Sequence, residues 1–417
     1  MAISPKPCNR RYKQIMKKQK QMKKKIFLSI FTLLFANVSF GQTKYEKDFR
    51  EFWNDINSNY AYLDQQKIDW NKVREIYEKK AKEVKNNDEF IQFMESVINE
   101  LHNGHNSLNT NLNESNRLVP SGQDMRVEEI EGKFSVTDLR KGFPAELAGL
   151  KIGNEIIGYN GKSIKEQLVK FLPKYTTSYS PEMQQYALDM LFAGTHDTKR
   201  VITINENGIS KDYFPDSIKI KKSVTLLEKK ILSKKMAYIK INNSLGDNNL
   251  IGEFDKAVDE FIKYKNIVID LTETPSGGNT TVGRTLMGRF INKTMPYQQH
   301  EFDEKEYENK RMWVEYVTPR KTQFKGKVFI LVGHWTGSMG EGIAIGFDGM
   351  KRATIIGTKM AGLIGAIDGF VLSQTKLGYQ VPIERLYHIN GMPRELFKPT
   401  IVTNNIDETI DKMNELK

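Results

Sequence analysis

VFILVGHWTGSMGEGIAIGFD, residues 328–348, joins two kinds of pattern within one stretch of sequence. It begins with a continuous run of β-branched and aromatic residues, which is typical of a strand buried on both faces. A corner of small residues follows, and the pattern then becomes helical, with Ile343, Phe347 and Met350 at helical spacing. The stretch therefore predicts a buried strand, a sharp corner and a helix.

Ser338 stands at this corner. A serine on a strand-to-helix corner presents its hydroxyl away from the sheet, and the backbone N–H groups that follow point toward whatever the hydroxyl attacks. The same serine can simply cap the helix, because Glu341 three positions later completes a capping box. The corner alone favours the cap over a nucleophile.

Positive charge is concentrated at the N-terminus. The 417 residues carry a formal charge of +12, and residues 1–41 hold ten Lys and Arg and no acidic residue. Removing those ten from the 63 basic residues leaves 53 against 51 acidic ones, a net charge of +2. A nearly neutral body gives no electrostatic support for binding to nucleic acid, so we expect no nucleic-acid partner.

Residues 22–41 combine a basic start, a short apolar segment and small residues before a cleavage position ahead of Gln42. This pattern predicts a secretory signal peptide, with 1–41 as a leader and the protein exported to a periplasm or secreted. The apolar segment is short for a membrane span, so a cleaved signal is favoured over a membrane anchor. Cys8, the one cysteine, precedes this segment, so the mature chain would have neither disulfides nor thiol catalysis.

Three further parts are expected after the leader. Apolar residues at helical spacing predict an N-terminal helical domain over 42–118. Short strand patterns separated by turn residues predict a β-rich module over 119–220, with a helix-leaning insertion at 165–195. Strands that alternate with helices predict a layered α/β core over 221–417.

Two loops carry further candidates. The segment LHNGHNSL, residues 101–108, places His105 just after a turn, where it is either a structural histidine or a general base. Its two histidines lack the shared helical face of a metal-binding pair. Gly277 and Gly278 follow a buried strand, where they can turn backbone N–H groups toward a ligand or form a simple turn.

The segment KGFPAELAGLKIGNEIIGYNGK, residues 141–162, resembles a PDZ domain of the permuted kind found in bacterial proteases. The resemblance implies that a peptide can add to this module as an extra strand. The loop expected to hold a peptide carboxylate reads GQDMRV at 122–127, which departs from the usual glycine-and-hydrophobic pattern.

Taken in order, these parts resemble the tail-specific, or C-terminal-processing, serine peptidases. The resemblance covers nearly all of 44–405 and is carried by the histidine loop, the PDZ-like segment, residues 269–278 and the corner Gly337–Glu341. It implies an α/β multidomain fold with a ClpP/crotonase-like protease core, a peptide or unfolded protein as substrate, and Ser338 as the nucleophile.

The base depends on the branch of this family. In the best-known branch a lysine in a Gly-Lys-Gly loop activates the serine, and here Leu363 occupies that place, with Lys359 nearby as an alternative base. In the tricorn-like branch a histidine and a glutamate take this role. His105 and Glu395 match them, and Glu395 would orient the imidazole directly, through Ser107 or through water.

The resemblance implies hydrolysis through an acyl-enzyme, with the N–H groups of Gly277, Gly278 and Met339 as oxyanion donors. No metal or other cofactor is implied, because the sequence holds neither His-Glu-x-x-His nor a phosphate-binding glycine loop. His334 is a second candidate base. Two alternatives stay open, a non-catalytic binder of peptides or other ligands on the same scaffold and an esterase, and neither substrate preference nor oligomeric state is specified.

Overall fold

The computed structural model describes residues 42–221 and 224–416. The predicted leader, with its signal peptide at 22–41 and Cys8, lies outside the described residues. Residues from Lys44 onward form one compact unit. Within the described ranges no helix is both long enough and apolar enough to cross a bilayer.

The central sheet has six strands in the order β16-β13-β12-β9-β8-β7. Five of them are parallel, and β7 is an antiparallel edge strand. Their bounds are β7 (Leu227–Ser233), β8 (Met236–Ile241), β9 (Asn266–Asp270), β12 (Lys327–Val332), β13 (Thr354–Gly357) and β16 (Ile401–Val402). The inner strands are apolar at nearly every position because both faces of a parallel sheet are covered.

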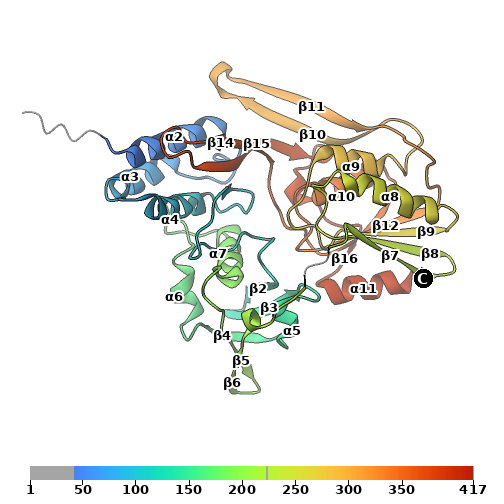
Figure 1. Cartoon of the computed structure of the whole chain (residues 1–417), viewed down its shortest axis with the longest axis horizontal. Helices are drawn as coiled ribbons and strands as arrows, with labels where there is room; N and C mark the ends of the chain where they lie inside the picture. The colour runs from blue at the N-terminus through green and yellow to red at the C-terminus, as the bar shows by residue number, and fades with distance from the viewer. Residues whose placement is uncertain (1–41, 222–223, 417) are drawn as a thin grey trace, which may run out of the picture. The chain divides into compact units, whose positions relative to one another are not determined.

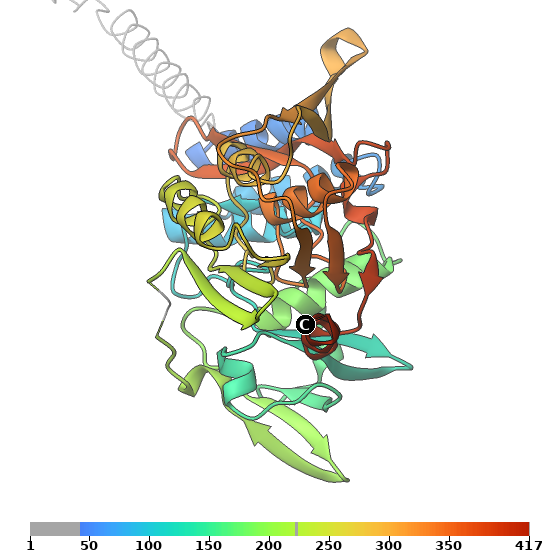
Figure 2. The same cartoon turned by 90° about the vertical axis from the view of Figure 1, so that its right-hand side faces the viewer.

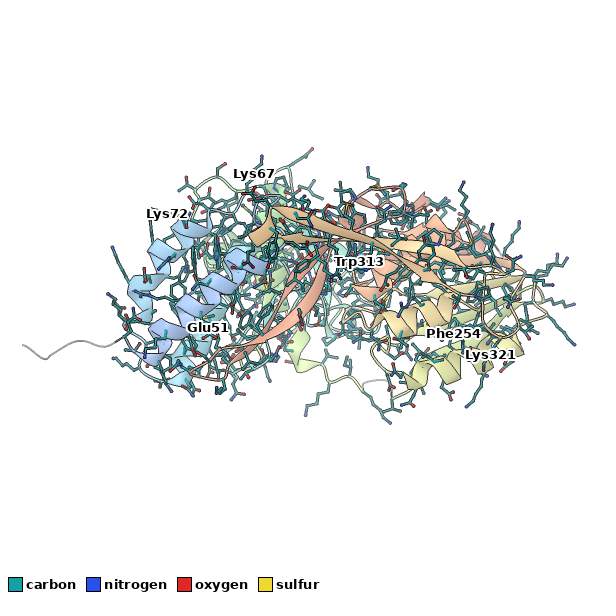
Figure 3. All side chains as sticks on the ribbon, turned by 90° about the horizontal axis from the view of Figure 1, so that it is seen from above. Glu51, Lys67, Lys72, Phe254, Trp313 and Lys321 are labelled. Carbon is teal, nitrogen blue, oxygen red and sulfur yellow. The ribbon has the colours of Figure 1, made fainter. Side chains whose placement is uncertain are left out.

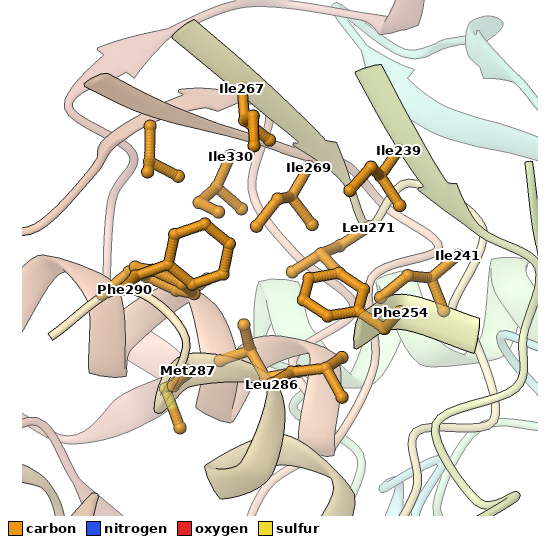
Figure 4. Close-up of a cluster of buried hydrophobic side chains, with 14 of the residues drawn as sticks. Ile239, Ile241, Phe254, Ile267, Ile269, Leu271, Leu286, Met287, Phe290 and Ile330 are labelled. Carbon is orange, nitrogen blue, oxygen red and sulfur yellow. The ribbon is translucent and has the colours of Figure 1, made fainter. Parts of the chain in front are cut away.

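Helices cover both faces of this sheet (Figures 1 and 2). The helices are α8 (Asn249–Glu260), α9 (Thr280–Met287) and α10 (Met339–Gly349) on one face and α11 (Ile406–Glu415) on the other. Figure 4 shows the larger core, where Ile269 and Ile330 of the sheet meet Phe254 of α8 and Leu286 of α9. Each fully buried aliphatic side chain of this kind contributes roughly 1.5–3 kcal/mol. The predicted α/β class is confirmed.

A second, antiparallel sheet has the order β1-β15-β10-β11, and β14 also pairs with β15. Its strands are β1 (Ser107–Leu108), β10 (Met295–Glu304), β11 (Asn309–Val317), β14 (Ala366–Val371) and β15 (Gly378–Tyr387). The tryptophan on β11, Trp313 (Figure 3), stacks on His300 of β10 with ring centroids 4.8 Å apart. Because Ser107 pairs with Gln380, the loop that carries His105 is fixed against the C-terminal part of the chain.

Three helices form the N-terminal part: α2 (Lys44–Asn59), α3 (Trp70–Ala81) and α4 (Asn87–Ile98). Their apolar faces, predicted from the helical spacing, pack in one core that also includes residues of β15. Phe52 of α2, for example, meets Tyr379 edge to face at 4.9 Å. The first helices and a strand near the end of the sequence therefore share their buried surface.

Residues 119–220 hold a third sheet in the order β2-β3-β4-β5-β6. The elements of this module are β2 (Met125–Ile130), β3 (Lys133–Leu139), α5 (Pro144–Leu147), β4 (Glu155–Tyr159), α6 (Ile164–Leu168), α7 (Pro181–Ala193), β5 (Ile202–Glu206) and β6 (Ile209–Tyr213). Asn160 and Gly161 have φ of 49° and 70°, as the predicted hairpin turn requires. Most of α6 and all of α7 fall in the predicted insertion at 165–195.

Candidate active site

Ser338 lies at the corner between β12 and α10, as predicted, and its backbone is strained. Its φ of 49° and ψ of −108° fall outside the conformations that serine usually adopts. Such a conformation costs about 1–3 kcal/mol and persists only where the surroundings impose it. One such restraint is the hydrogen bond from the Ser338 N–H to Oε2 of Glu341, at 2.8 Å, which is one half of the predicted capping box.

The loop after β9 brings glycine backbone against this corner. A methyl group built on Gly277 would stand 2.4 Å from Cβ of Ser338 and 3.0 Å from the backbone nitrogen of Met339. A methyl group on Gly278 would stand 2.1 Å from the carbonyl oxygen of Leu245. Neither position has room for a side chain, so the two glycines allow the backbone to approach the serine closely.

The three predicted oxyanion donors differ in their hydrogen bonds. The Gly277 N–H donates to the carbonyl of Thr274 at 3.0 Å. The N–H groups of Gly278 and Met339 make no hydrogen bond with any residue in 42–221 or 224–416. Met339 is the first residue of α10, where backbone N–H groups have no partner inside the helix. Gly278 and Met339 are therefore the donors left available.

His105 is buried, with 6% of its surface exposed, in the loop between η1 (Asn99–Leu101) and β1. The side-chain oxygen of Asn103 accepts the His105 backbone N–H at 3.0 Å. The ring atom Nδ1 lies 3.2 Å from the carbonyl oxygen of Ile364. A carbonyl oxygen only accepts, so Nδ1 carries the proton, and Nε2 is left as the acceptor nitrogen.

Burial lowers the pKa of His105 to about 4, and the positive charge of Arg394 acts in the same direction. Hydrogen bonds to the carbonyls of Ile364 and Gly365 oppose this shift. The imidazole is therefore neutral at pH 7. A neutral imidazole is the form that accepts a proton from a nucleophile.

One leucine separates the loops that carry His105 and Ser338. Cδ2 of Leu363 lies 3.2 Å from a methyl group built on Gly104, and Cδ1 lies 3.0 Å from one built on Gly337. The two glycines directly precede the histidine and the serine. Within the described ranges no hydrogen bond joins the two side chains, and their loops come together around Leu363.

Two other sequence candidates, Glu395 and Lys359, differ in their exposure. Glu395 is half-buried in η4 (Arg394–Leu396), where burial raises its pKa and the charges of Arg394, Arg385 and Lys359 oppose the rise. Glu395 makes no hydrogen bond to His105 in the part of the chain that the structure describes. Lys359 is exposed.

His334 faces the β-rich module. Its Nδ1 lies 2.9 Å from Oδ2 of Asp138 at the end of β3. The next residue, Trp335, donates its indole N–H to the carbonyl of Gln123 at 2.8 Å. The segment that leads to the serine is thus fixed to the module.

Arg394 was not predicted from the sequence as a site residue. It is 4% exposed, and its Nη2 donates to the carbonyl oxygen of Leu363 at 2.6 Å. The only indication in the sequence was its place next to Glu395. Its contacts depend on the directions of loop carbonyls, which no sequence pattern specifies.

Two family models match this chain. Residues 235–403 match peptidase family S41, and residues 42–99 match the tricorn protease C1 domain. The corner of Ser338 and the five parallel strands of the central sheet lie within the first match. This part of the chain is therefore similar to the peptidases of family S41, and the chain is a peptidase. No curated protein matches the chain significantly.

Solved peptidase structures share the fold. Mature CPAF matches with a TM-score of 0.64 at 13% identity, over 89% of this chain and 96% of that one. The photosystem II D1 C-terminal processing protease matches with a TM-score of 0.56 at 15% identity, over 87% and 94%. A putative peptidase from Parabacteroides merdae matches with a TM-score of 0.51 at 14% identity, over 89% and 93%.

Proposed function

We propose that this chain is an exported serine peptidase that cleaves peptide bonds through an acyl-enzyme, with Ser338 as nucleophile and His105 as base. The observation that carries the proposal is the state of His105. The imidazole is buried and neutral, its Nδ1 is held by the Ile364 carbonyl, and its loop meets that of Ser338 across Leu363. A serine hydroxyl becomes a good nucleophile only when such a base accepts its proton.

The reaction follows from this arrangement. Nε2 of His105 takes the proton of the Ser338 hydroxyl as Oγ attacks the substrate carbonyl. The N–H groups of Gly278 and Met339 stabilise the oxyanion, and one such donor is worth on the order of 3 kcal/mol. The imidazolium then protonates the leaving amine, and water hydrolyses the acyl-enzyme by the same route.

We assign the base to His105 rather than to a lysine. A lysine acts as a base near pH 7 only when burial lowers its pKa. Lys359 is exposed, and the position of the family's lysine is filled by the apolar, buried Leu363. These features support the histidine-dependent, tricorn-like branch.

Glu395 is proposed as the carboxylate that supports His105. Nδ1 already donates to Ile364, so the carboxylate would act through Ser107 or water rather than by direct contact. Its influence on the base is therefore expected to be smaller than that of a carboxylate bonded to the ring.

Labelling with a fluorophosphonate probe tests the proposal, because the probe reacts with an activated serine. We expect labelling of the wild type, none in Ser338→Ala, strong loss in His105→Gln and no change in Lys359→Ala. An unlabelled wild type that binds peptides would support the non-catalytic binder. Export is tested separately by the N-terminus of the mature protein, which we expect at Gln42.

A further inference from the structure

The loop 362–365 connects the two halves of the site, and a backbone group of each of its residues bonds a side chain. The Gly362 N–H donates to Oε1 of Glu341 at 2.9 Å. Nη2 of Arg394 donates to the carbonyls of Leu363 at 2.6 Å and Gly365 at 3.4 Å. The carbonyl between these two is that of Ile364, which holds the ring of the proposed base.

Glu341 extends this connection to the nucleophile. Its Oε2 accepts the Ser338 N–H at 2.8 Å, while its Oε1 accepts the N–H of the loop. A single carboxylate therefore joins the strained backbone of the serine to the loop that orients the histidine.

Glu341 and Arg394 form a buried pair. They are 1% and 4% exposed, and Nη2 of Arg394 lies 3.8 Å from Oε2 of Glu341. Removing one partner of such a pair leaves an uncompensated charge in the interior. Each partner also bonds backbone groups of the site, which fixes its position.

We propose that Arg394 and Glu341 act as a clamp that positions His105 and Ser338 relative to each other through the loop 362–365. The proposal rests on the proposed function, because it assigns a role in that same reaction. Neither residue touches the reacting atoms, so both are positioning residues.

A second arginine provides the comparison that separates positioning from simple support of the fold. Arg352 also donates to backbone carbonyls, those of Phe290 at 2.6 Å and of Phe324 and Gly326 at 2.8 Å. None of these carbonyls contacts His105 or Ser338. Arg352 thus bonds several loop carbonyls, as Arg394 does, but none of them belongs to the loop that holds His105.

The test measures fluorophosphonate labelling of Ser338 in the full chain as a function of probe concentration and pH. In Arg394→Ala we expect the maximal labelling rate to fall about 100-fold, since a base displaced by about 1 Å loses activity on that scale. The probe concentration at half-maximal rate should change little. Guanidinium ion at sub-denaturing concentration should restore part of the rate.

The charge of Arg394 gives a separate readout. Without this charge the protonated form of His105 is less disfavoured, so its pKa rises. The acid limb of the pH profile of labelling should therefore move to higher pH in Arg394→Gln. Arg394→Lys keeps the charge but not the planar pair of donors. It should therefore retain the wild-type acid limb while its maximal rate falls.

Arg352→Ala is the matched control. It should lower stability to unfolding while leaving the acid limb in place and gaining nothing from guanidinium. Glu341→Gln should also reduce the maximal rate, because one of its two N–H partners loses a carboxylate oxygen as acceptor. Arg394→Lys serves as the positioning variant if Arg394→Ala does not fold.

The proposal is overturned if Arg394→Ala or Arg394→Lys labels at the wild-type maximal rate. It is also overturned if the Arg394 and Arg352 variants lose activity equally, with unmoved acid limbs and no guanidinium rescue. Both outcomes leave the proposed function intact as long as labelling still requires Ser338 and His105. A wild type that never labels contradicts the proposed function instead.

Discussion

Gly277 approaches Ser338 so closely that a methyl group on its α-carbon would stand 2.4 Å from the serine Cβ. The backbone of the loop after β9 therefore packs against the Ser338 side chain. The α-carbon of Gly277 has no space for a substituent larger than hydrogen. This contact places the glycine loop beside the hydroxyl and next to the N–H of Met339. It also makes the site sensitive to a single methyl group.

Gly277→Ala should reduce labelling by at least about 100-fold, the effect of losing an oxyanion donor, because the loop must move away from the serine. Gly132→Ala is the control: Gly132 also has a positive φ, 78°, but open space around it, against 64° at Gly277. Both variants carry the same kind of backbone strain. Equal labelling in the two would show that the close approach has no role in the reaction.

Glu395→Gln should lower the labelling rate by roughly 10-fold, and His105→Gln by at least about 1000-fold. The difference is expected because the Ile364 carbonyl already fixes the tautomer of His105. The rates at pH 7 measure both effects. If the labelling rate of Glu395→Gln is as low as that of His105→Gln, the Glu395 carboxylate and not the Ile364 carbonyl orients the base.

The labelling rate of the wild type should stay near its plateau from pH 7 to pH 5 and fall to half near pH 4. This follows from the pKa of His105, which burial lowers to about 4, so the ring stays neutral through that range. His102 provides a control, because burial also lowers its pKa to about 4, yet its ring bonds the carbonyl of Glu100 and not the loop 362–365. His102→Gln should keep the wild-type acid limb. An acid limb near pH 6.5 in the wild type would contradict the buried, neutral imidazole.

The same shift predicts a cost in stability at low pH. The pKa of His105 in the folded chain lies below its value of 6.5 in the unfolded chain. Between pH 6.5 and 4 the unfolded chain therefore binds more protons than the folded chain does. When the pH falls from 7.5 to 4.5, the free energy of unfolding should decrease in a protein that keeps His105. This decrease should be about 2–3 kcal/mol larger than in the His105→Gln variant. Urea unfolding of Ser338→Ala and Ser338→Ala/His105→Gln measures this difference. A pH-independent difference would show that His105 protonates freely in the folded state.

Local patterns predicted much of the fold. The apolar run before Ser338 and the helical spacing after it gave the strand, corner and helix that the structure shows. Asn160-Gly161 specified its hairpin turn because both residues tolerate positive φ. In these cases the physical cause lies within a few neighbouring residues.

The β10–β11 hairpin was not predicted. Its strands are rich in charged and polar residues, and β10 is positioned by pairing with β15, more than eighty residues later, as in the pair His300 and Leu386. The role of Arg394 was missed for the same reason. Its partners are carbonyls of a distant loop, whose directions follow from the folded backbone and not from residue types.

The rate of fluorophosphonate labelling at Ser338, compared between the wild type, His105→Gln and Lys359→Ala at pH 7, tests the central claim most directly. We predict fast labelling in the wild type and in Lys359→Ala and a loss of at least about 1000-fold in His105→Gln. Fast labelling in His105→Gln together with loss in Lys359→Ala would contradict the assignment of His105 as the base.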